Sequence, residues 1–242
     1  MAEILRRDKD EPIVEPGVLR PEHLAEGVSP IVAFVGSGNR YGREIAGIRD
    51  EGLGQNVDYE SVPESYVISA INDKPKFTRD LSDCTSLIAV GRESGSGREL
   101  SFLTHQKQVE IDGSSREAFV TQLKGRLEEI KNKCSAGTID VVIAGGRFKT
   151  GQDYKYQESI EALGLAVQGA LGFEPLVVVG PKSGDKDDIY LGANRTLYVI
   201  RPEGRDIKPV LHNEPFKPSE IERMKPKWKK EEEAHKPFGE WK

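Results

Sequence analysis

Cysteine and histidine are the residues of this chain best suited to nucleophilic chemistry, and both are scarce. The 242 residues include two cysteines and four histidines. Cys84 precedes the segment 91–98 (GRESGSGR), and His105 follows it. Glycine and serine at this position are typical of a hairpin turn, and β-type stretches flank it at 85–90 and 99–105. The sequence therefore predicts an antiparallel β-hairpin.

The predicted hairpin brings the thiol and the imidazole to one face. A turn centred between Ser94 and Gly95 makes Cys84 and His105 a facing pair. Directly opposite side chains have Cβ atoms about 4.5–5.5 Å apart. A two-residue change of register would leave them diagonal neighbours, whereas a one-residue slip would put them on opposite faces.

This pair suits acyl transfer. A free thiol has a pKa of about 8.5, and a neighbouring imidazole can take its proton and later give one to a leaving group. A third polar group usually orients the imidazole, and the residues alone leave four upstream candidates open: Thr78, Asp80, Ser82 and Asp83. The alternative is a purely structural pair, with Cys84 buried and His105 exposed to water.

Hydrophobic patterning predicts the elements that position this pair. Ser114 and Glu117 form a capping-box pattern, and apolar residues then recur at helical spacing, which predicts a helix at 116–133. A second helix is expected at 156–171. Further strands are expected at 31–35, 66–71, 139–144, 176–179 and 197–200. The predicted fold is α+β, with a mixed β-sheet or β-sandwich core flanked by two or three helices.

Proline and charge divide the chain into three parts. Residues 1–30 form an expected N-terminal arm, residues 31–201 the α+β domain, and residues 202–242 a charged C-terminal tail. Cys134 ends the first predicted helix and is assigned no chemistry. His23, His212 and His235 lie in the tails and are expected to be solvated.

Composition excludes several classes of function. The net charge of −5 argues against nucleic acid as the main partner. No apolar run approaches the roughly 20 residues of a membrane span, so membrane insertion is not expected. The charged start lacks a signal-peptide core, so we expect a cytoplasmic origin. Two cysteines and four histidines without metal-ligand spacing make a zinc site unexpected.

The order of these elements resembles a known family. Thr78 stands six residues before Cys84 in KFTRDLSDCTSLIAV, a hairpin leads to His105 in ELSFLTHQ, and a helix, DVVIAGG, a second helix and PLVVVG follow. Over about residues 66–201 this arrangement resembles the CheD family of chemoreceptor glutamine deamidases and the catalytic domains of cytotoxic necrotising factor and the related lethal-factor toxin.

The resemblance implies a function and a role for each site residue. Cys84 would be the nucleophile, His105 the general base and acid, and Thr78 the group that orients the imidazole. The reaction would deamidate glutamine side chains of a protein substrate, without metal or organic cofactor, in the cytoplasm or, for a toxin-like relative, in another cell. Two features depart from the family pattern: Asp83 replaces glycine or serine before the cysteine, and the cysteine-to-histidine interval is longer.

Other readings remain open. A deamidase-like fold without catalysis could act as an interaction module, and the same Cys-His pair could support transglutamination or peptide hydrolysis. The segment Gly36–Gly42 (GSGNRYG) approximates a dinucleotide fingerprint, but glycines interrupt the helix that should follow, which favours a turn between two strands. Gly145 and Gly146 at a strand end are interpreted as a turn, with an anion contact as the alternative.

Overall fold

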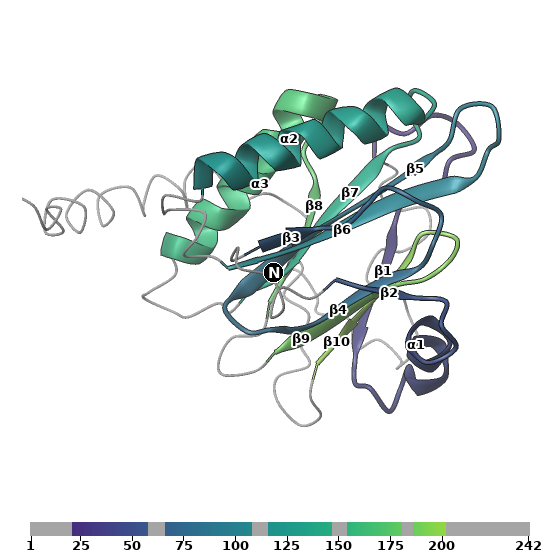
Figure 1. Cartoon of the computed structure of the whole chain (residues 1–242), viewed down its shortest axis with the longest axis vertical. Coiled ribbons are helices and arrows are strands. Elements are labelled where there is room, and N and C mark those ends of the chain that lie inside the picture. Colours follow the sequence, from purple (N-terminus) through teal and green to yellow (C-terminus); the bar gives the residue numbers. More distant parts are fainter. Residues whose placement is uncertain (1–20, 58–65, 108–115, 147–153, 181–185, 202–242) are drawn as a thin grey trace, which may run out of the picture.

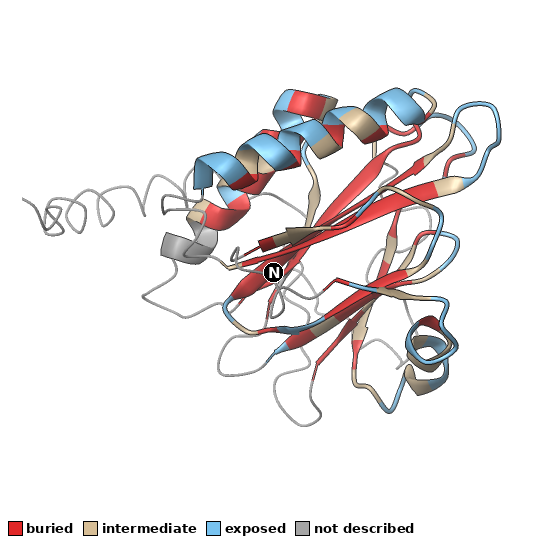
Figure 2. Cartoon of the chain, in the orientation of Figure 1, coloured by how far each residue is buried: buried red, intermediate tan, exposed pale blue. Residues whose placement is uncertain are grey.

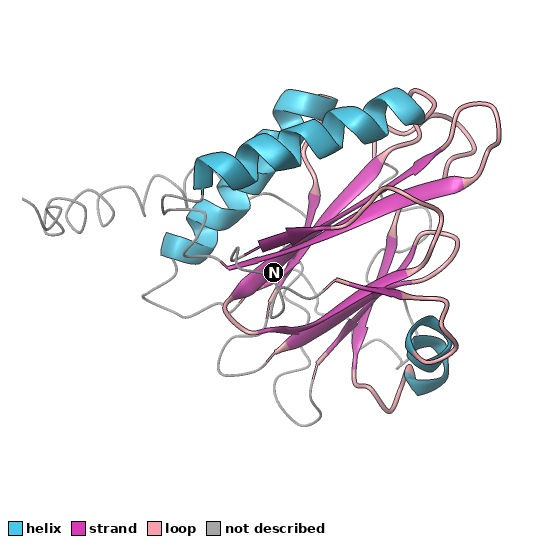
Figure 3. Ribbon diagram, in the orientation of Figure 1, coloured by secondary structure: helices cyan, strands magenta, loops and turns pink. Residues whose placement is uncertain are grey.

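Two β-sheets packed face to face form the centre of the domain. The computed structural model describes residues 21–57, 66–107, 116–146, 154–180 and 186–201. Two long helices cover the outer face of one sheet, and a short helix lies against the outer face of the other, which gives four layers (Figures 1 and 3). This arrangement confirms the predicted α+β class with a sandwich core.

The first sheet is mixed. Its strands, in spatial order, are β1 (Val32–Gly36), β10 (Thr196–Ile200), β9 (Asp187–Leu191), β4 (Lys76–Leu81) and β2 (Gln55–Asn56). β1 runs parallel to β10 and β2 parallel to β4, while the other neighbours are antiparallel.

The second sheet is built around the predicted hairpin. Its strands, in spatial order, are β3 (Tyr66–Ile68), β6 (Glu99–Lys107), β5 (Cys84–Arg92), β7 (Asp140–Gly145) and β8 (Leu176–Val179). β5 and β6 form the hairpin, and β7 and β8 are its one parallel pair among the described strands.

Three helices complete the described fold: α1 (Gly42–Arg49), α2 (Arg116–Lys133) and α3 (Tyr154–Leu171). The bounds of α2 confirm the predicted helix, and its predicted apolar stripe is buried: Phe119, Leu123, Leu127 and Ile130. Among the described helices, none is long and apolar enough to cross a membrane.

Alternation along β5 divides the core into two apolar layers. Leu87 and Ala89 face the layer under α2 and α3, whereas Ile88 and Val90 face the layer between the sheets. Both faces of this strand are therefore buried, as the red central strands of Figure 2 show. Full burial of each large aliphatic side chain contributes about 1.5–3 kcal/mol.

Four elements were not predicted: α1, β2, β4 and β9. β2 has only two residues, too few to show an alternating pattern. β4 and β9 carry polar or charged residues at inward positions, which interrupts the apolar pattern of a strand. α1 forms despite Gly47, because Ile45 and Ile48 pack against Phe77 and Tyr190 of the sheet. Tertiary packing thus outweighs the weak helix propensity of glycine.

Residues 21–30 pack against the domain. Leu24 and Val28 are buried, and the Ala25 N–H donates to the Gly137 carbonyl. The prediction of a solvated His23 is wrong, because its ring stacks on Phe173 with a centroid distance of 3.6 Å. The other two tail histidines and the segment 202–242 lie outside the described residues.

Candidate functional site

The hairpin forms, but its turn lies one residue later than predicted. The Glu93 N–H donates to the Arg98 carbonyl at 2.7 Å, and the loop between them contains Gly95 and Gly97 at φ 92° and 72°. Only glycine adopts such backbone angles at little cost, so these two residues fit the observed loop.

The tip of the hairpin docks on the end of α2, which fixes the turn. Glu93 forms a β-bridge with Cys134, and the Ser94 N–H donates to the Lys133 carbonyl at 2.9 Å. The Ser135 N–H donates in turn to the Arg92 carbonyl at 2.8 Å. These contacts join segments about forty residues apart in sequence, so local patterning gives no sign of them.

The observed register corrects the predicted facing pair. Cys84 lies opposite Lys107, and His105 is displaced from that position by two residues. The direct Cys84–His105 pairing is therefore wrong. Because side chains two residues apart on a strand share a face, the thiol and the imidazole still lie on the same face as diagonal neighbours.

Thr78 and His105 meet across the space between the two sheets. A hydrogen bond of 2.6 Å joins Thr78 Oγ1 to His105 Nδ1. Thr78 comes from β4 of one sheet and His105 from β6 of the other, and both are buried, with exposures of 0% and 1%. When the hydroxyl accepts the Nδ1 proton, the lone pair of the neutral imidazole is on Nε2. The contact thus orients the ring and can select its tautomer.

A tight crossing between the sheets positions Cys84. β4 ends at Leu81, β5 begins at Cys84, and only two residues connect them. A bulge precedes the crossing: Asp80 has φ 62°, and the Ser82 N–H donates to its carbonyl at 2.8 Å. Cys84 thus occupies the first position of its strand, facing the inter-sheet layer, and is 3% exposed.

Two glycines let a neighbouring strand approach this crossing. Gly145 and Gly146, at the end of β7, have φ angles of 82° and 83°. A Cβ atom at Gly145 would lie 2.8 Å from Leu81 Cδ1 and 3.2 Å from the Cys84 carbonyl oxygen. Both the backbone conformation and the close approach therefore require glycine here.

A buried ion pair lies on the same inward face of the first sheet. Arg201 Nε donates to Asp187 Oδ1 at 2.9 Å, and a second guanidinium nitrogen donates to Oδ2 at 3.2 Å. Asp187 pairs in register with Leu81, so the ion pair borders the crossing that carries Cys84. Sequence reasoning missed these residues, because an acid at the start of one strand and a base after the end of another carry no local signal of pairing.

Lys76 is a second charged group between the sheets. Its side chain is fully buried, and Nζ donates to Asn72 Oδ1 at 2.7 Å, the Lys74 carbonyl at 3.0 Å and Ser101 Oγ at 3.0 Å. Burial, which penalises the ammonium, lowers the pKa of Lys76 to about 8.

This lowered pKa predicts a pH-dependent stability. Between pH 8 and the ordinary lysine pKa of 10.5, the unfolded chain binds more protons at this site than the folded chain. The free energy of unfolding should therefore rise from about pH 8 to about pH 10.5, by up to about 3 kcal/mol from this group. Urea unfolding of wild type and Lys76→Met across this range measures the effect, because tyrosine ionisation is common to both proteins. A constant difference between the two proteins would contradict the prediction.

The dinucleotide alternative lacks its expected structural context. β1 leads through the glycine segment into α1, so the predicted turn between two strands is wrong. However, β1 is an edge strand paired with β10. The next strand, β2, lies at the opposite edge of the sheet, so β1, α1 and β2 do not form the unit of adjacent parallel strands that binds dinucleotides.

A hollow near the glycine segment is lined by groups of both charges. Its walls include Gly38, Asp80, Lys186, Asp188 and Arg201. Lys186 forms an ion pair with Asp80 at 2.6 Å, so these walls offer no uniform field for an anionic ligand. Within the described residues, no group of three or more His, Cys, Asp or Glu side chains is placed to hold a metal ion.

Comparisons with known proteins add no relative to this picture. No protein-family model matches the chain, and no curated protein matches it significantly. The geometry of Thr78, His105 and Cys84 is therefore the basis for a functional proposal.

Proposed function

We propose that this protein is a cysteine-dependent glutamine deamidase that acts on protein substrates. The observation that carries the proposal is the buried hydrogen bond of 2.6 Å between Thr78 Oγ1 and His105 Nδ1, with Cys84 on the same face of the hairpin. An imidazole oriented at one nitrogen by a polar group, on the same face as a thiol, is an arrangement that can support nucleophilic cysteine catalysis.

The reaction would proceed through a thioester. His105 accepts the thiol proton, and the sulfur of Cys84 attacks the side-chain carboxamide carbon of a glutamine. His105 then gives the proton to the departing nitrogen, ammonia leaves, and water hydrolyses the thioester to glutamate. Thr78 keeps the imidazole in one orientation through both proton transfers.

Asp83 is the acidic residue that departs from the pattern of the resembled family, and its exposure determines how strongly it can affect the thiol. Asp83 is exposed, whereas the neighbouring Cys84 is buried. Water and salt screen an exposed charge, so its carboxylate opposes formation of a thiolate less than a buried acid would. This supports retention of a reactive thiol.

A second candidate is a deamidase-like module that binds a partner without catalysis. The exposures of 3% for Cys84 and 1% for His105 favour it, since a substrate carboxamide must reach the sulfur. The two candidates differ in thiol chemistry: a module has no need of a cysteine activated at neutral pH.

Peptides containing one internal glutamine provide the test. Wild type should release ammonia and raise the mass of the peptide by about one dalton, because an acid replaces an amide, and Cys84→Ser should do neither. Equal ammonia release by both proteins would contradict the proposal. Backbone cleavage would indicate peptide hydrolysis, and incorporation of an added amine would indicate transglutamination.

A further inference from the structure

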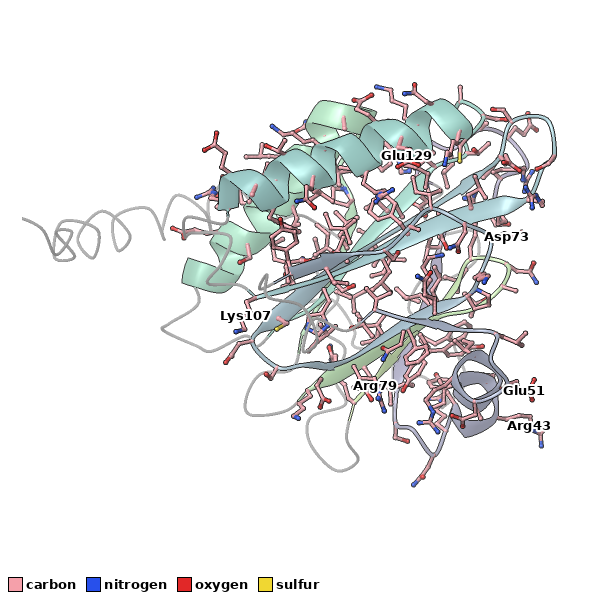
Figure 4. All side chains as sticks on the ribbon, viewed as in Figure 1. Arg43, Glu51, Asp73, Arg79, Lys107 and Glu129 are labelled. Carbon is pink, nitrogen blue, oxygen red and sulfur yellow. The ribbon has the colours of Figure 1, made fainter. Side chains whose placement is uncertain are left out.

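Lys107 is the residue directly opposite Cys84 in the hairpin. The register pairs these two positions at the end of the hairpin away from its turn. Facing residues of an antiparallel pair project to the same side, with Cβ atoms about 4.5–5.5 Å apart. Figure 4 labels Lys107 at this end of the second sheet. The Cβ atoms of Lys107 and Cys84 are thus neighbours by strand geometry, within reach of the lysine amine, while His105 occupies the diagonal position.

Other facing pairs of the same hairpin show that this register produces contacts. Thr85 faces Gln106, and the Gln106 Nε2 amide donates to Thr85 Oγ1 at 2.9 Å. At the other end, Arg92 faces Glu99, and these side chains form an ion pair at 3.4 Å. Contact between facing side chains therefore occurs immediately beside Cys84 and again at the far end of the ladder.

The surroundings of Lys107 suit an electrostatic effect on the thiol. Lys107 is half-buried, and Cys84 is buried. Charges interact more strongly where water is partly excluded, and a nearby ammonium favours a thiolate over a thiol. The exposed carboxylate of Asp83 is the opposing charge nearest in sequence, and solvent screens it.

We propose that Lys107 is a positioning residue that stabilises the thiolate form of Cys84. The inference rests on the proposed function only for the substrate that the thiolate would attack. The electrostatic effect of Lys107 on the thiol requires no turnover. The thiol proton passes to His105 or to water, no electron is transferred, and the positive charge of Lys107 stabilises the negative sulfur. Thr78 and Lys107 would then have separate roles. Thr78 orients the imidazole of His105, and Lys107 stabilises the thiolate of Cys84.

The test is the pH dependence of Cys84 alkylation by iodoacetamide, measured at that residue by peptide mass spectrometry. Lys107→Gln should raise the apparent pKa of Cys84 by about one unit, which slows alkylation at pH 7 about tenfold. Lys107→Arg keeps the positive charge and should restore most of the wild-type rate. Lys124→Gln removes an exposed lysine from α2 and should have no effect, which controls for net charge.

Two outcomes would overturn the inference. One is an unchanged Cys84 pKa in Lys107→Gln, with thermal unfolding showing that the variant is folded. The other is equal loss of reactivity in Lys107→Arg and Lys107→Gln, which would assign the effect to side-chain packing. Alkylation requires no glutamine substrate, so a lysine-dependent pKa in a protein that releases no ammonia would contradict only the proposed function.

Discussion

Replacing Arg201 by methionine is expected to lower the free energy of unfolding by about 3–5 kcal/mol. Arg201 is 5% exposed and Asp187 0% exposed, and two hydrogen bonds join them between the sheets. Removing one partner leaves the other charge buried, which costs far more than the net contribution of the pair. Urea unfolding followed by far-UV circular dichroism measures this loss.

Two further variants make this prediction specific. Arg98→Met removes an exposed arginine that pairs with Asp73 and Glu93, and it should cost less than about 1 kcal/mol. The double variant Asp187→Leu with Arg201→Met removes both buried charges and should recover much of the lost stability. If the single Arg201→Met variant is as stable as Arg98→Met, the predicted loss of unfolding free energy on breaking the buried pair is wrong.

If the proposed deamidation takes place, replacing His105 by asparagine is expected to reduce its rate about 10²–10⁴-fold, the range that general acid–base catalysis contributes. Asparagine keeps a polar side chain of related shape but cannot exchange a proton at neutral pH. The measurement is kcat/KM for a glutamine peptide over a range of pH, with thermal unfolding to show that the variant is folded. Undiminished kcat/KM in folded His105→Asn would exclude the histidine from catalysis.

Thr78 variants separate orientation of the imidazole from proton transfer. Thr78→Val removes the hydroxyl while keeping the branched shape, and it should reduce kcat/KM less than loss of the imidazole does. Thr78→Ser keeps the hydroxyl that meets His105 Nδ1 and should retain most activity. Equal activity of the valine and serine variants would contradict the orienting role.

Local patterning was sufficient for the elements of the second sheet and its covering helices. The stripe from Phe119 to Ile130 predicted α2, and GRESGSGR predicted the hairpin, because both signals are local in sequence. Register was predicted less well. Gly95 and Gly97 permit several turns, and docking of Glu93 on Cys134 selects among them only in the folded domain.

The first sheet was harder to predict because its inward positions are not uniformly apolar. Lys76 and Thr78 face the interior from β4, as does Asp187 from β9, so neither strand has a clear apolar alternation. Thr78 was chosen through family resemblance, since the residues alone left four candidates open. Its contact with His105 joins different sheets, and no local pattern encodes such a contact.

The two polar bridges between β4 and β6 also limit how the sheets can slide past one another. Lys76 bonds Ser101, and two residues further along β4 Thr78 bonds His105. Apolar contact alone is non-directional and would tolerate a small translation of one sheet over the other. The bridges are directional, and a shift of one two-residue repeat, about 7 Å, would break both. They therefore fix the relative position of the two sheets, so that the imidazole of one sheet meets the hydroxyl of the other each time the chain folds.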